Sequence, residues 1–571
     1  MMSAFLRKAR QLIDDPILRR WLLHAVLNRS GASGFRPNHP PYLNDIPLPL
    51  TAERPAPHGR EILRKTAPAQ PLKSVSLALP AGPAHLEPGE AETLFDRQFS
   101  DIERQLAVYR FAWLPLTDVD FDRGWVEALW REFSKRFSQP DGTWAWHPYC
   151  VAERAINILD YARHHGLPGE PSETLTFLAR HAAAITARLE YFGEHNTSNH
   201  LSNNGRGLYR IGLALGLPAA TEVGKRILLT EAKRIFLPSG VLREGSSHYH
   251  FLLTRNYVDA FLAAKRHGCP EAEALAEIAR RALGVCAQLR LPGGLPLVGD
   301  ISPDCPPDFL LDLLGGQRTG WTKLLSPEDH EAFVTLSREA TANGRLDKDG
   351  WIRIEKDPWS VLFHVAPDGW LPMPGHAHQD IGSFEAHYGQ TRLFVDPGRG
   401  SYERPSELDD DVSAAAHNNL TVDGQEPYPP NKPYYTERFR RSVCLSSPQW
   451  VQSDERLSLS LPGFSRLPGL SGVERDLELS TNGLLIQDRI EGQDNHAVVR
   501  RLHCPWPVER IGPAFEMRSP AGTFRITADG ELSATQGRYW FAYGVSRPMT
   551  TLSASWRGAL PAHLEIRVEP I

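Results

Sequence analysis

The stretch SFEAHYGQTRLFVDPG, residues 383–398, alternates apolar and polar side chains on both sides of a Gly-Gln pair and ends at Pro-Gly. Alternation with a period of two predicts strands with one buried face, and the glycine predicts a hairpin between them. Short runs of the same kind, separated by Gly, Asn, Asp or Pro, recur from about residue 350 onward. They are residues 359–367, 419–425, 441–447, 457–464, 473–480, 482–492, 496–505 and 563–570. Together these runs predict a large antiparallel β-sandwich domain over residues 346–571.

Upstream of this region the hydrophobic spacing changes to three and four residues, which predicts amphipathic helices. Several of these segments end at a glycine, as helices commonly do. They are residues 124–137, 149–166, 172–193, 199–216, 221–236 and 256–268. Short connections favour antiparallel helix pairs, as in a helical solenoid or an α/α toroid, and the spacing does not separate a closed ring from an open stack.

The predicted fold class is therefore α+β and multidomain: an α/α toroid over residues 95–345, an incomplete helical barrel, followed by the sandwich. Residues 1–94 are expected to form a partly irregular N-terminal arm, rich in proline from about residue 37 to residue 88, with a short strand in residues 74–80. A cleft between two such domains is a natural ligand site.

Composition excludes several classes of function. The formal net charge of -5 gives no basic field for nucleic acid. The six cysteines form no CxxC pair, which argues against a zinc ribbon or a thioredoxin-like site. No apolar stretch approaches the roughly 20 residues of a membrane span, and the N-terminus lacks a convincing signal segment. A cytoplasmic location is expected, and periplasmic or exported locations are compatible with the sequence. A homo-oligomer is compatible with it too, but the sequence does not indicate the oligomeric state.

One group of candidate metal ligands lies around the motif HAHQD. In a regular strand His376, His378 and Asp380 share a face. Imidazole and carboxylate suit zinc or a similar divalent ion, and Asp396 and His417 stand near strand ends where they would complete such a site. The alternative is that these are solvated residues on an exposed sheet face. His387, which has no such companion, is expected to be a surface imidazole.

A second group of candidates lies in the helical half. Asn199 and His200 stand at an expected helix start, where an amide and an imidazole side by side would bind and neutralise a carboxylate. Tyr249 and Tyr257 follow in residues 242–261, and a tyrosine hydroxyl near an imidazole can give or take a proton. Tyr249 is the candidate for this chemistry, and Tyr257 is a candidate substrate contact.

Candidate substrate contacts come from residues 141–159. Trp144 and Trp146 offer indole faces that stack on sugar rings, and Arg154 offers a guanidinium for a carboxylate or sulfate. Buried aromatic packing explains these residues equally well.

Four motifs taken together resemble the heparinase II/III family of polysaccharide lyases and its alginate-lyase relatives. They are NHLSNNG at residues 199–205, REGSSHYH at residues 243–250, residues 375–402, and HNNLTVDGQ at residues 417–425. The resemblance implies the same toroid and sandwich, with β-elimination on uronic-acid polysaccharides.

By this resemblance, Asn199 and His200 correspond to the pair that binds the uronate carboxylate. Tyr249 corresponds to the catalytic tyrosine and His376 to the histidine that partners it. Three residues correspond to ligands of a structural metal, usually zinc: His378, Asp396 and His417. One departure is Asn203, which stands about where some relatives carry a glutamate.

The expected function is a lyase that cleaves an anionic polysaccharide or oligosaccharide and leaves 4,5-unsaturated uronate ends. Tyr249 is expected to protonate the leaving oxygen and, for one C5 configuration, also to act as base; His376 or His200 is the base for the other. Three alternatives remain open. They are a glycoside hydrolase using Glu153 and Glu244, a non-catalytic acidic-polysaccharide-binding protein, and a hydrolase with a catalytic metal at the HAHQD motif.

Overall fold

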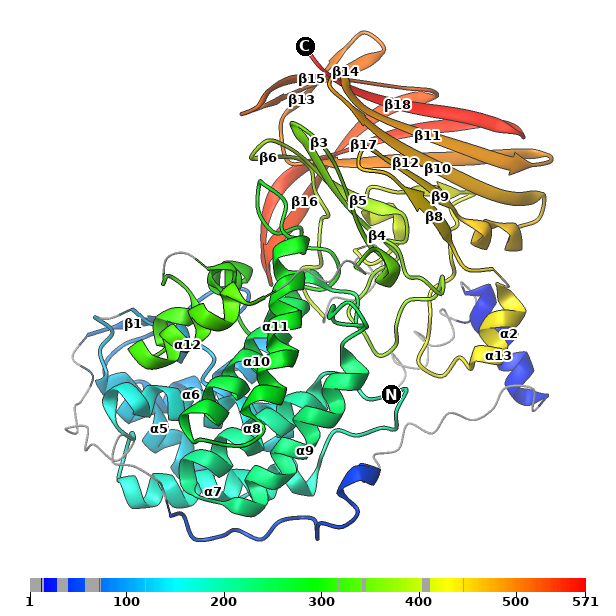
Figure 1. Ribbon diagram of the computed structural model, residues 1–571. Helices are drawn as coiled ribbons and strands as arrows, with labels where there is room; N and C mark the ends of the chain where they lie inside the picture. The colour runs from blue at the N-terminus through cyan, green and yellow to red at the C-terminus, as the bar shows by residue number, and fades with distance from the viewer. Residues whose placement is uncertain are drawn as a thin grey trace.

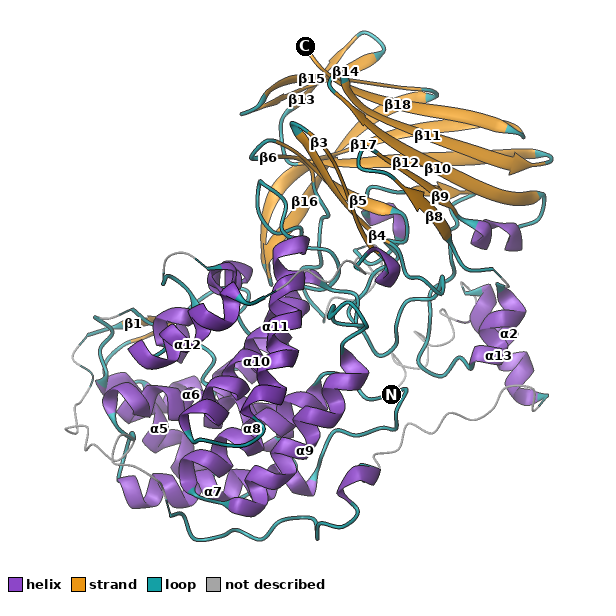
Figure 2. Cartoon of the chain, in the orientation of Figure 1, coloured by secondary structure: helices purple, strands orange, loops and turns teal. Residues whose placement is uncertain are grey.

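The structure, a computed structural model, describes residues 12, 15–27, 39–56, 71, 73–118, 120–315, 318–340, 346–402, 411–444 and 446–571. The helices gather in one body and the long strands in another, as Figure 1 and Figure 2 show. This is the predicted order, helices first and sheets second, and it confirms the α/α toroid followed by an antiparallel β-sandwich. The predicted domain boundary at residue 345 falls on residues 341–345, which lie outside the described residues.

Helices of the toroid pack in consecutive pairs, among them α6 with α7, α8 with α9 and α10 with α11. Their bounds are α4 (Ile102–Arg110), α5 (Gly124–Arg136), α6 (Pro148–His165), α7 (Pro171–Ala187), α8 (His200–Leu215), α9 (Pro218–Ile235), α10 (Ser247–Arg266), α11 (Ala272–Leu289) and α12 (Pro327–Arg338). All six predicted helices are present. The helix α10 begins well before the predicted residue 256, because Ser246 accepts a hydrogen bond from the Tyr249 N–H and caps it.

Glycines set the close contact between α8 and α9. A Cβ on Gly205 would lie 2.5 Å from Ile227 Cγ2, and one on Gly224 would lie 2.4 Å from the Tyr209 backbone nitrogen. The absence of side chains at these two positions lets the helix backbones approach and holds the start of α8, which carries Asn199 and His200, in place.

Every strand pair of the C-terminal domain is antiparallel. An eight-stranded sheet has the order β13-β14-β15-β18-β11-β10-β9-β8, and two four-stranded sheets have the orders β16-β17-β12-β7 and β3-β4-β5-β6. The bounds are β3 (Trp351–Lys356), β4 (Trp359–His364), β5 (Ser383–Tyr388), β6 (Thr391–Phe394), β7 (Leu420–Val422), β8 (Gln449–Gln452), β9 (Arg456–Ser460), β10 (Leu470–Ser480), β11 (Gly483–Gly492), β12 (Asn495–Cys504), β13 (Val508–Ile511), β14 (Ala514–Ser519), β15 (Gly522–Ala528), β16 (Glu531–Ala542), β17 (Val545–Ala559) and β18 (Ala562–Pro570).

The two domains share buried apolar contacts. Trp351 and Leu362 from the β3-β4 hairpin and Trp540 from β16 belong to the same buried cluster as side chains of α10 and α11. An apolar interface of this kind fixes the relative position of two domains. Residues on loops of both domains therefore meet in a defined geometry.

The N-terminal arm packs on both domains where it is described. The predicted strand in residues 74–80 is present as β1 (Val75–Leu77), which pairs with β2 (Ala84–Leu86), and the short helix α3 (Ala91–Leu94) follows. Ahead of them α2 (Pro16–Val26) lies beside α13 (Glu437–Val443), as Figure 1 shows, with the Trp21 and Tyr434 ring centroids 4.5 Å apart. Among the described residues, no helix has the length and apolar character needed to cross a bilayer.

Two predicted strands are wrong. Residues 441–447 were expected to be a strand, but α13 runs through Val443 because Thr436 caps it and Phe439 and Val443, four residues apart, are both buried. The HAHQD motif is a loop rather than a strand. Its backbone bonds to other loops: the His376 N–H donates to Glu244 O at 2.7 Å, and the Gln379 N–H donates to Val412 O at 2.8 Å.

Candidate active site

The candidate site forms where helix starts of the toroid meet the loop of the HAHQD motif. Asn199 directly precedes α8, and Tyr249 lies in the first turn of α10. The loop is joined to the toroid by two backbone hydrogen bonds, from His376 N to Glu244 O at 2.7 Å and from Asp300 N to His376 O at 2.8 Å. The structure thus brings together residues that are up to 177 positions apart in the chain.

Tyr249 and His376 are stacked, with ring centroids 3.5 Å apart and an angle of 10° between the planes. The Tyr249 hydroxyl lies 2.9 Å from the Tyr402 hydroxyl. Burial and the nearby Asp304 carboxylate raise the pKa of Tyr249 well above its usual value. The phenol is therefore protonated at rest, which suits a proton donor. Sequence reasoning missed Tyr402, which closes the motif VDPGRGSY.

Asp300 joins the two histidines of the HAHQD motif. Its Oδ2 lies 3.0 Å from His376 Nδ1 and its Oδ1 lies 2.9 Å from His378 Nε2. Burial acts to raise the pKa of Asp300, but the hydrogen bonds from the two histidines outweigh it and lower the pKa. A carboxylate on Nδ1 places the His376 proton there and leaves the lone pair on Nε2, which faces the Asn199 amide. Sequence reasoning missed Asp300 because it lies in a loop without a motif.

Glu244 holds Asn199. Its two carboxylate oxygens accept hydrogen bonds from the Asn199 backbone N–H at 2.8 Å and from Asn199 Nδ2 at 2.7 Å. The same Nδ2 lies 3.3 Å from His376 Nε2. The amide, the imidazole and the phenol therefore form one cluster, with the amide nitrogen directed at His376 Nε2.

His200, the residue after Asn199, is more exposed than this cluster, with 43% of its side chain accessible. Its Nδ1 lies 2.8 Å from Glu190 Oε1, and its ring lies 4.6 Å from the ring of Tyr149. Burial of the ring lowers the pKa of His200, but the Glu190 carboxylate outweighs this effect and the pKa is raised. A protonated imidazole facing solvent can bind an anionic group.

The three predicted metal ligands lie close together but are paired in another way. His417 Nδ1 lies 2.9 Å from Asp396 Oδ2, and the His378 and His417 rings are 5.4 Å apart. His378 Nδ1 and His417 Nε2 are buried and have no hydrogen-bond partner, and the same holds for His503 Nε2. In the part of the chain that the structure describes, no group of three His, Cys, Asp or Glu stands in an arrangement that could hold a metal ion. The metal stays a prediction.

Three of the predicted substrate contacts, Trp146, Arg154 and Tyr257, are buried in the toroid, which corrects the prediction for them, whereas Trp144 is exposed. Arg154 is fully buried; its guanidinium donates to the carbonyls of Tyr109 and Ala145 and lies over the ring of Trp146. Trp146 is only 1% exposed, and Tyr257 is fully buried and donates to Leu228 O at 3.0 Å. Their internal partners leave no face for a sugar.

Two further sequence interpretations change. His387 is fully buried, not at the surface, because the second face of β5 is covered by the toroid: its Nδ1 accepts a hydrogen bond from the Gly293 N–H at 3.0 Å, and its Nε2 lies 2.8 Å from Glu385 Oε1. Asp380 does not join the metal candidates and instead lies 2.8 Å from His364 Nδ1. The loop conformation of HAHQD is the reason, because it removes the alternation of a regular strand.

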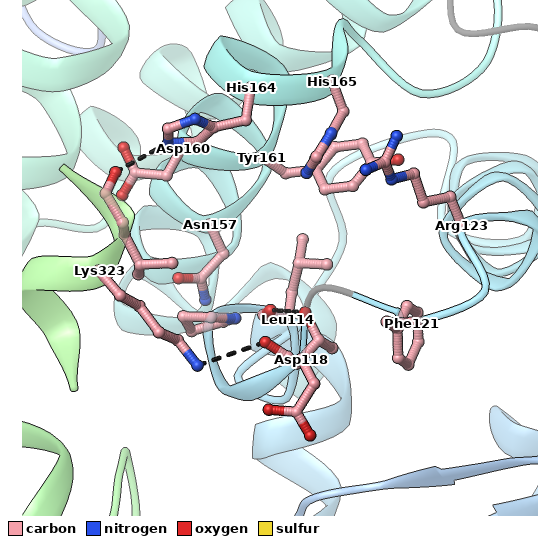
Figure 3. A pocket seen from close by; sticks show the side chains of 13 residues that line it. Leu114, Asp118, Phe121, Arg123, Asn157, Asp160, Tyr161, His164, His165 and Lys323 are labelled. Carbon is pink, nitrogen blue, oxygen red and sulfur yellow. Dashed lines mark hydrogen bonds between the residues drawn. The ribbon is translucent and has the colours of Figure 1, made fainter. Parts of the chain in front are cut away.

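One cavity lies beside the candidate site, and another lies farther along the toroid. One, of about 730 Å³, is lined by both domains, and its lining includes Asn196, Gly245 and Trp370; the first two are close in sequence to Asn199 and Glu244. The other, of about 540 Å³, is shown in Figure 3 and is lined by the second half of α6, including Asn157, Tyr161 and His165. None of the predicted site residues lines this second cavity, and Tyr161 lies about 18 Å along α6 from Tyr149.

Comparison with known proteins finds a family match in the C-terminal part of the chain. Residues 339–566 match the family model described as Heparinase II/III-like, C-terminal. This chain carries a heparinase II/III-like C-terminal domain. The resemblance predicted from the sequence motifs is thus confirmed. No curated protein sequence matches the chain significantly.

Solved structures with a heparinase fold are similar over most of the chain. A crystal structure of heparinase III superposes with a TM-score of 0.63 at 15% identity, covering 83% of this chain and 78% of that one. A mutant of the heparan sulfate lyase HepC from Pedobacter heparinus has a TM-score of 0.53 at 14% identity, covering 86% and 80%. At these identities the similarity concerns the fold.

Proposed function

We propose that this heparinase II/III-like chain is a polysaccharide lyase that cleaves a uronic-acid-containing polysaccharide or oligosaccharide by β-elimination. The observation that carries the proposal is the stacking of Tyr249 on His376, with Asn199 Nδ2 3.3 Å from His376 Nε2. A proton donor, a proton acceptor and a carboxylate-binding amide thereby share one site at the domain junction.

Binding of the uronate carboxylate is the first requirement. The C5 proton of a uronate is a very weak acid while the neighbouring carboxylate carries its charge, and donors that neutralise this charge stabilise the enolate-like intermediate. His200 supplies a half-exposed imidazolium, and Asn199 supplies an amide that Glu244 fixes in orientation. Both groups lie at the start of α8, where backbone N–H groups also favour an anion.

Proton transfer then requires a base and an acid. For one C5 configuration, His376 Nε2 takes the C5 proton, the C5–H electrons form the C4=C5 double bond, and the C4–O4 bond breaks. Tyr249 donates its hydroxyl proton to O4, so charge and atoms balance. For the other configuration, Tyr249 first loses its hydroxyl proton; the phenolate then takes the C5 proton as base and returns it to O4 as acid. A well-placed acid or base contributes on the order of 100- to 10,000-fold.

The hydrolase alternative has less support. It needs two carboxyl groups that face each other across the sugar, with room for a water molecule. Glu153 is buried and accepts a hydrogen bond from Arg206 Nη1 at 2.9 Å, and Glu244 is fully buried and bonded to Asn199. Both carboxylates have internal partners and serve the packing and positioning of α8.

The proposed function is tested by incubating the protein with a panel of uronate polymers, namely heparan sulfate, chondroitin sulfate, alginate and polyglucuronate. We expect ultraviolet absorbance to rise with at least one of them, because elimination creates a double bond conjugated with the carboxylate. Reducing ends that increase without this absorbance would show hydrolysis instead.

A divalent metal is proposed at His378, Asp396 and His417. Zinc is favoured because imidazole nitrogen and carboxylate oxygen are among its usual ligands. The unpartnered nitrogens of His378, His417 and the nearby His503 fit such a group, because buried imidazole nitrogens without partners are costly. Asp396 lies on the other ring nitrogen of His417, Nδ1, and would have to leave it to join the ligands. When bound, the metal would supply a brace between the HAHQD loop and the residues before β7. It has no part in the proton transfers above.

We expect the purified protein to contain about one zinc per chain, and His417→Ala to lose it and to melt at a lower temperature. Metal content by elemental analysis and thermal unfolding are the measurements. His563→Ala, at an exposed position on β18, is the control and should leave both unchanged. An equal metal content in wild type and His417→Ala would disprove this ligand set.

The ion pair of His200 with Glu190 predicts a pH dependence. His200 carries its charge below its raised pKa, so substrate binding should be intact below that pKa and weaken as the pH rises through it. Glu190→Gln removes the carboxylate, and the alkaline decline of kcat/KM should move to lower pH by about one unit or more. Glu273→Gln, at an exposed ion pair on α11, should leave the pH profile in place. An unchanged profile in Glu190→Gln would rule out His200 as the group that titrates.

A further inference from the structure

Trp144 is an exposed indole near the candidate site. It is 51% accessible, and it is the one aromatic side chain among the strongly exposed large apolar residues that the structure describes. Exposed aromatic residues beside a polar site commonly serve binding, because the apolar ring gains by leaving water.

Buried residues fix the backbone that carries Trp144. Trp144 begins a short 3-10 helix that ends at Trp146, whose indole is inserted into the core, and Arg154 Nη1 donates to the carbonyl of Ala145 at 2.9 Å. On the other side, Asp141 Oδ1 accepts hydrogen bonds from the Thr143 backbone N–H at 2.8 Å and from its hydroxyl at 2.6 Å. The buried residues thus hold the exposed indole in a defined position.

A continuous series of contacts connects Trp144 with the proposed carboxylate-binding group. The Trp144 and His147 ring centroids are 5.3 Å apart, and His147 Nε2 lies 3.6 Å from Glu190 Oε1. The same carboxylate oxygen lies 2.8 Å from His200 Nδ1. Trp144 therefore lies one side chain beyond the pair of Glu190 and His200.

Arg188 adds an exposed positive charge to this surface. Its Nη1 lies 3.4 Å from Asp141 O, in the loop that precedes Trp144, and the side chain is exposed. The pKa of His147 is lowered, chiefly by burial and also by the charges of His200, Arg110 and Arg188. The Glu190 carboxylate raises it by less than these effects lower it. The surface therefore presents two rings, of which His147 is neutral near pH 7, and one cation.

We propose that Trp144, His147 and Arg188 form a saccharide subsite beside the elimination site, where the indole stacks on a sugar ring and Arg188 binds a carboxylate or sulfate of the same chain. The inference rests on the proposed function, because it assigns the neighbouring unit of that polysaccharide. A pyranose offers an apolar face of C–H groups that fits an indole, and an acidic sugar unit offers the charge that fits a guanidinium.

The test measures binding without cleavage. In the Tyr249→Phe background, the dissociation constant is measured by calorimetry for heparan sulfate and for alginate, with and without Trp144→Ala. We expect Trp144→Ala to weaken binding of the preferred polymer about tenfold, and Trp144→Phe to recover part of the loss. Val451→Ala, an exposed apolar residue on β8, is the control and should bind as the parent does.

The outcomes separate the subsite from the proposed function. Unchanged affinity in Trp144→Ala, while the wild type still cleaves the polymer, overturns the subsite and leaves the lyase standing. Weakened binding in Trp144→Ala, while the wild type cleaves no polymer, supports the subsite and overturns the lyase. Neither binding nor cleavage of any polymer in the panel overturns both.

Discussion

Tyr249→Phe is expected to abolish the ultraviolet absorbance produced from a cleavable uronate polymer, with a fall in kcat on the order of 100- to 10,000-fold. The substitution removes the hydroxyl that is proposed to protonate O4. It keeps the ring that stacks on His376 at 3.5 Å, so the site should keep its shape and its affinity for polymer. Initial rates and polymer binding are the measurements.

Two tyrosine variants serve as controls for this result. Tyr257→Phe removes a hydroxyl that donates to Leu228 O inside the toroid, and its rate should remain within a few fold of wild type. Tyr402→Phe removes the hydroxyl 2.9 Å from that of Tyr249 and should have a smaller effect than Tyr249→Phe, because Tyr402 contacts the proposed proton donor rather than replacing it. Full activity in Tyr249→Phe would refute its assignment as the acid.

Asp259→Asn is expected to destabilise the toroid strongly. Asp259 lies between two buried arginines of α8: it accepts a hydrogen bond from Arg206 Nε at 2.8 Å and one from Arg210 Nη1. Loss of one partner from a buried charge cluster costs about 3–5 kcal/mol. For a domain of this size, we expect the melting temperature to fall by roughly 10 °C.

The matched control is Asp96→Asn, which breaks an ion pair with Arg136 in which the aspartate side chain is 68% exposed. An exposed pair contributes at most about 1 kcal/mol, so the melting temperature of Asp96→Asn should differ little from that of wild type.

Burial tends to raise the pKa of Asp259, but Arg210 and Arg206 outweigh it and the pKa is lowered. The stabilisation from Asp259 is therefore present at neutral pH and is lost on acidification. The difference in melting temperature between Asp259→Asn and wild type should become smaller at acidic pH. Equal melting temperatures for the two variants at neutral pH would contradict this role.

The sequence was sufficient for the fold because the two hydrophobic periods occupy separate halves of the chain. It also named Asn199, Tyr249 and His376, which the structure brings into one cluster. The α13 segment was misassigned because its apolar pattern is too short to separate a helix from a strand. Asp300 and Tyr402 were missed because each acts through a contact made by a loop far away in the chain.

Burial was the property least accessible from sequence. Trp144 and Trp146 lie two residues apart in one turn, and only the packing of Arg154 and Phe177 shows that Trp146 is the buried one. His387 alternates with Phe384 and Ala386 as an exposed residue should. It is nevertheless buried, because the toroid covers the second face of β5. In both cases the deciding neighbour comes from an element that the local pattern does not contain.

The central claim is elimination, and product analysis in water enriched in heavy oxygen tests it most directly. Elimination transfers no oxygen from water, so mass spectrometry should show two products whose masses sum to that of the parent chain. One product should carry an unsaturated uronate end, and neither should contain the heavy isotope. Products that together gain one water and carry heavy oxygen at the new reducing end would show hydrolysis and contradict the account.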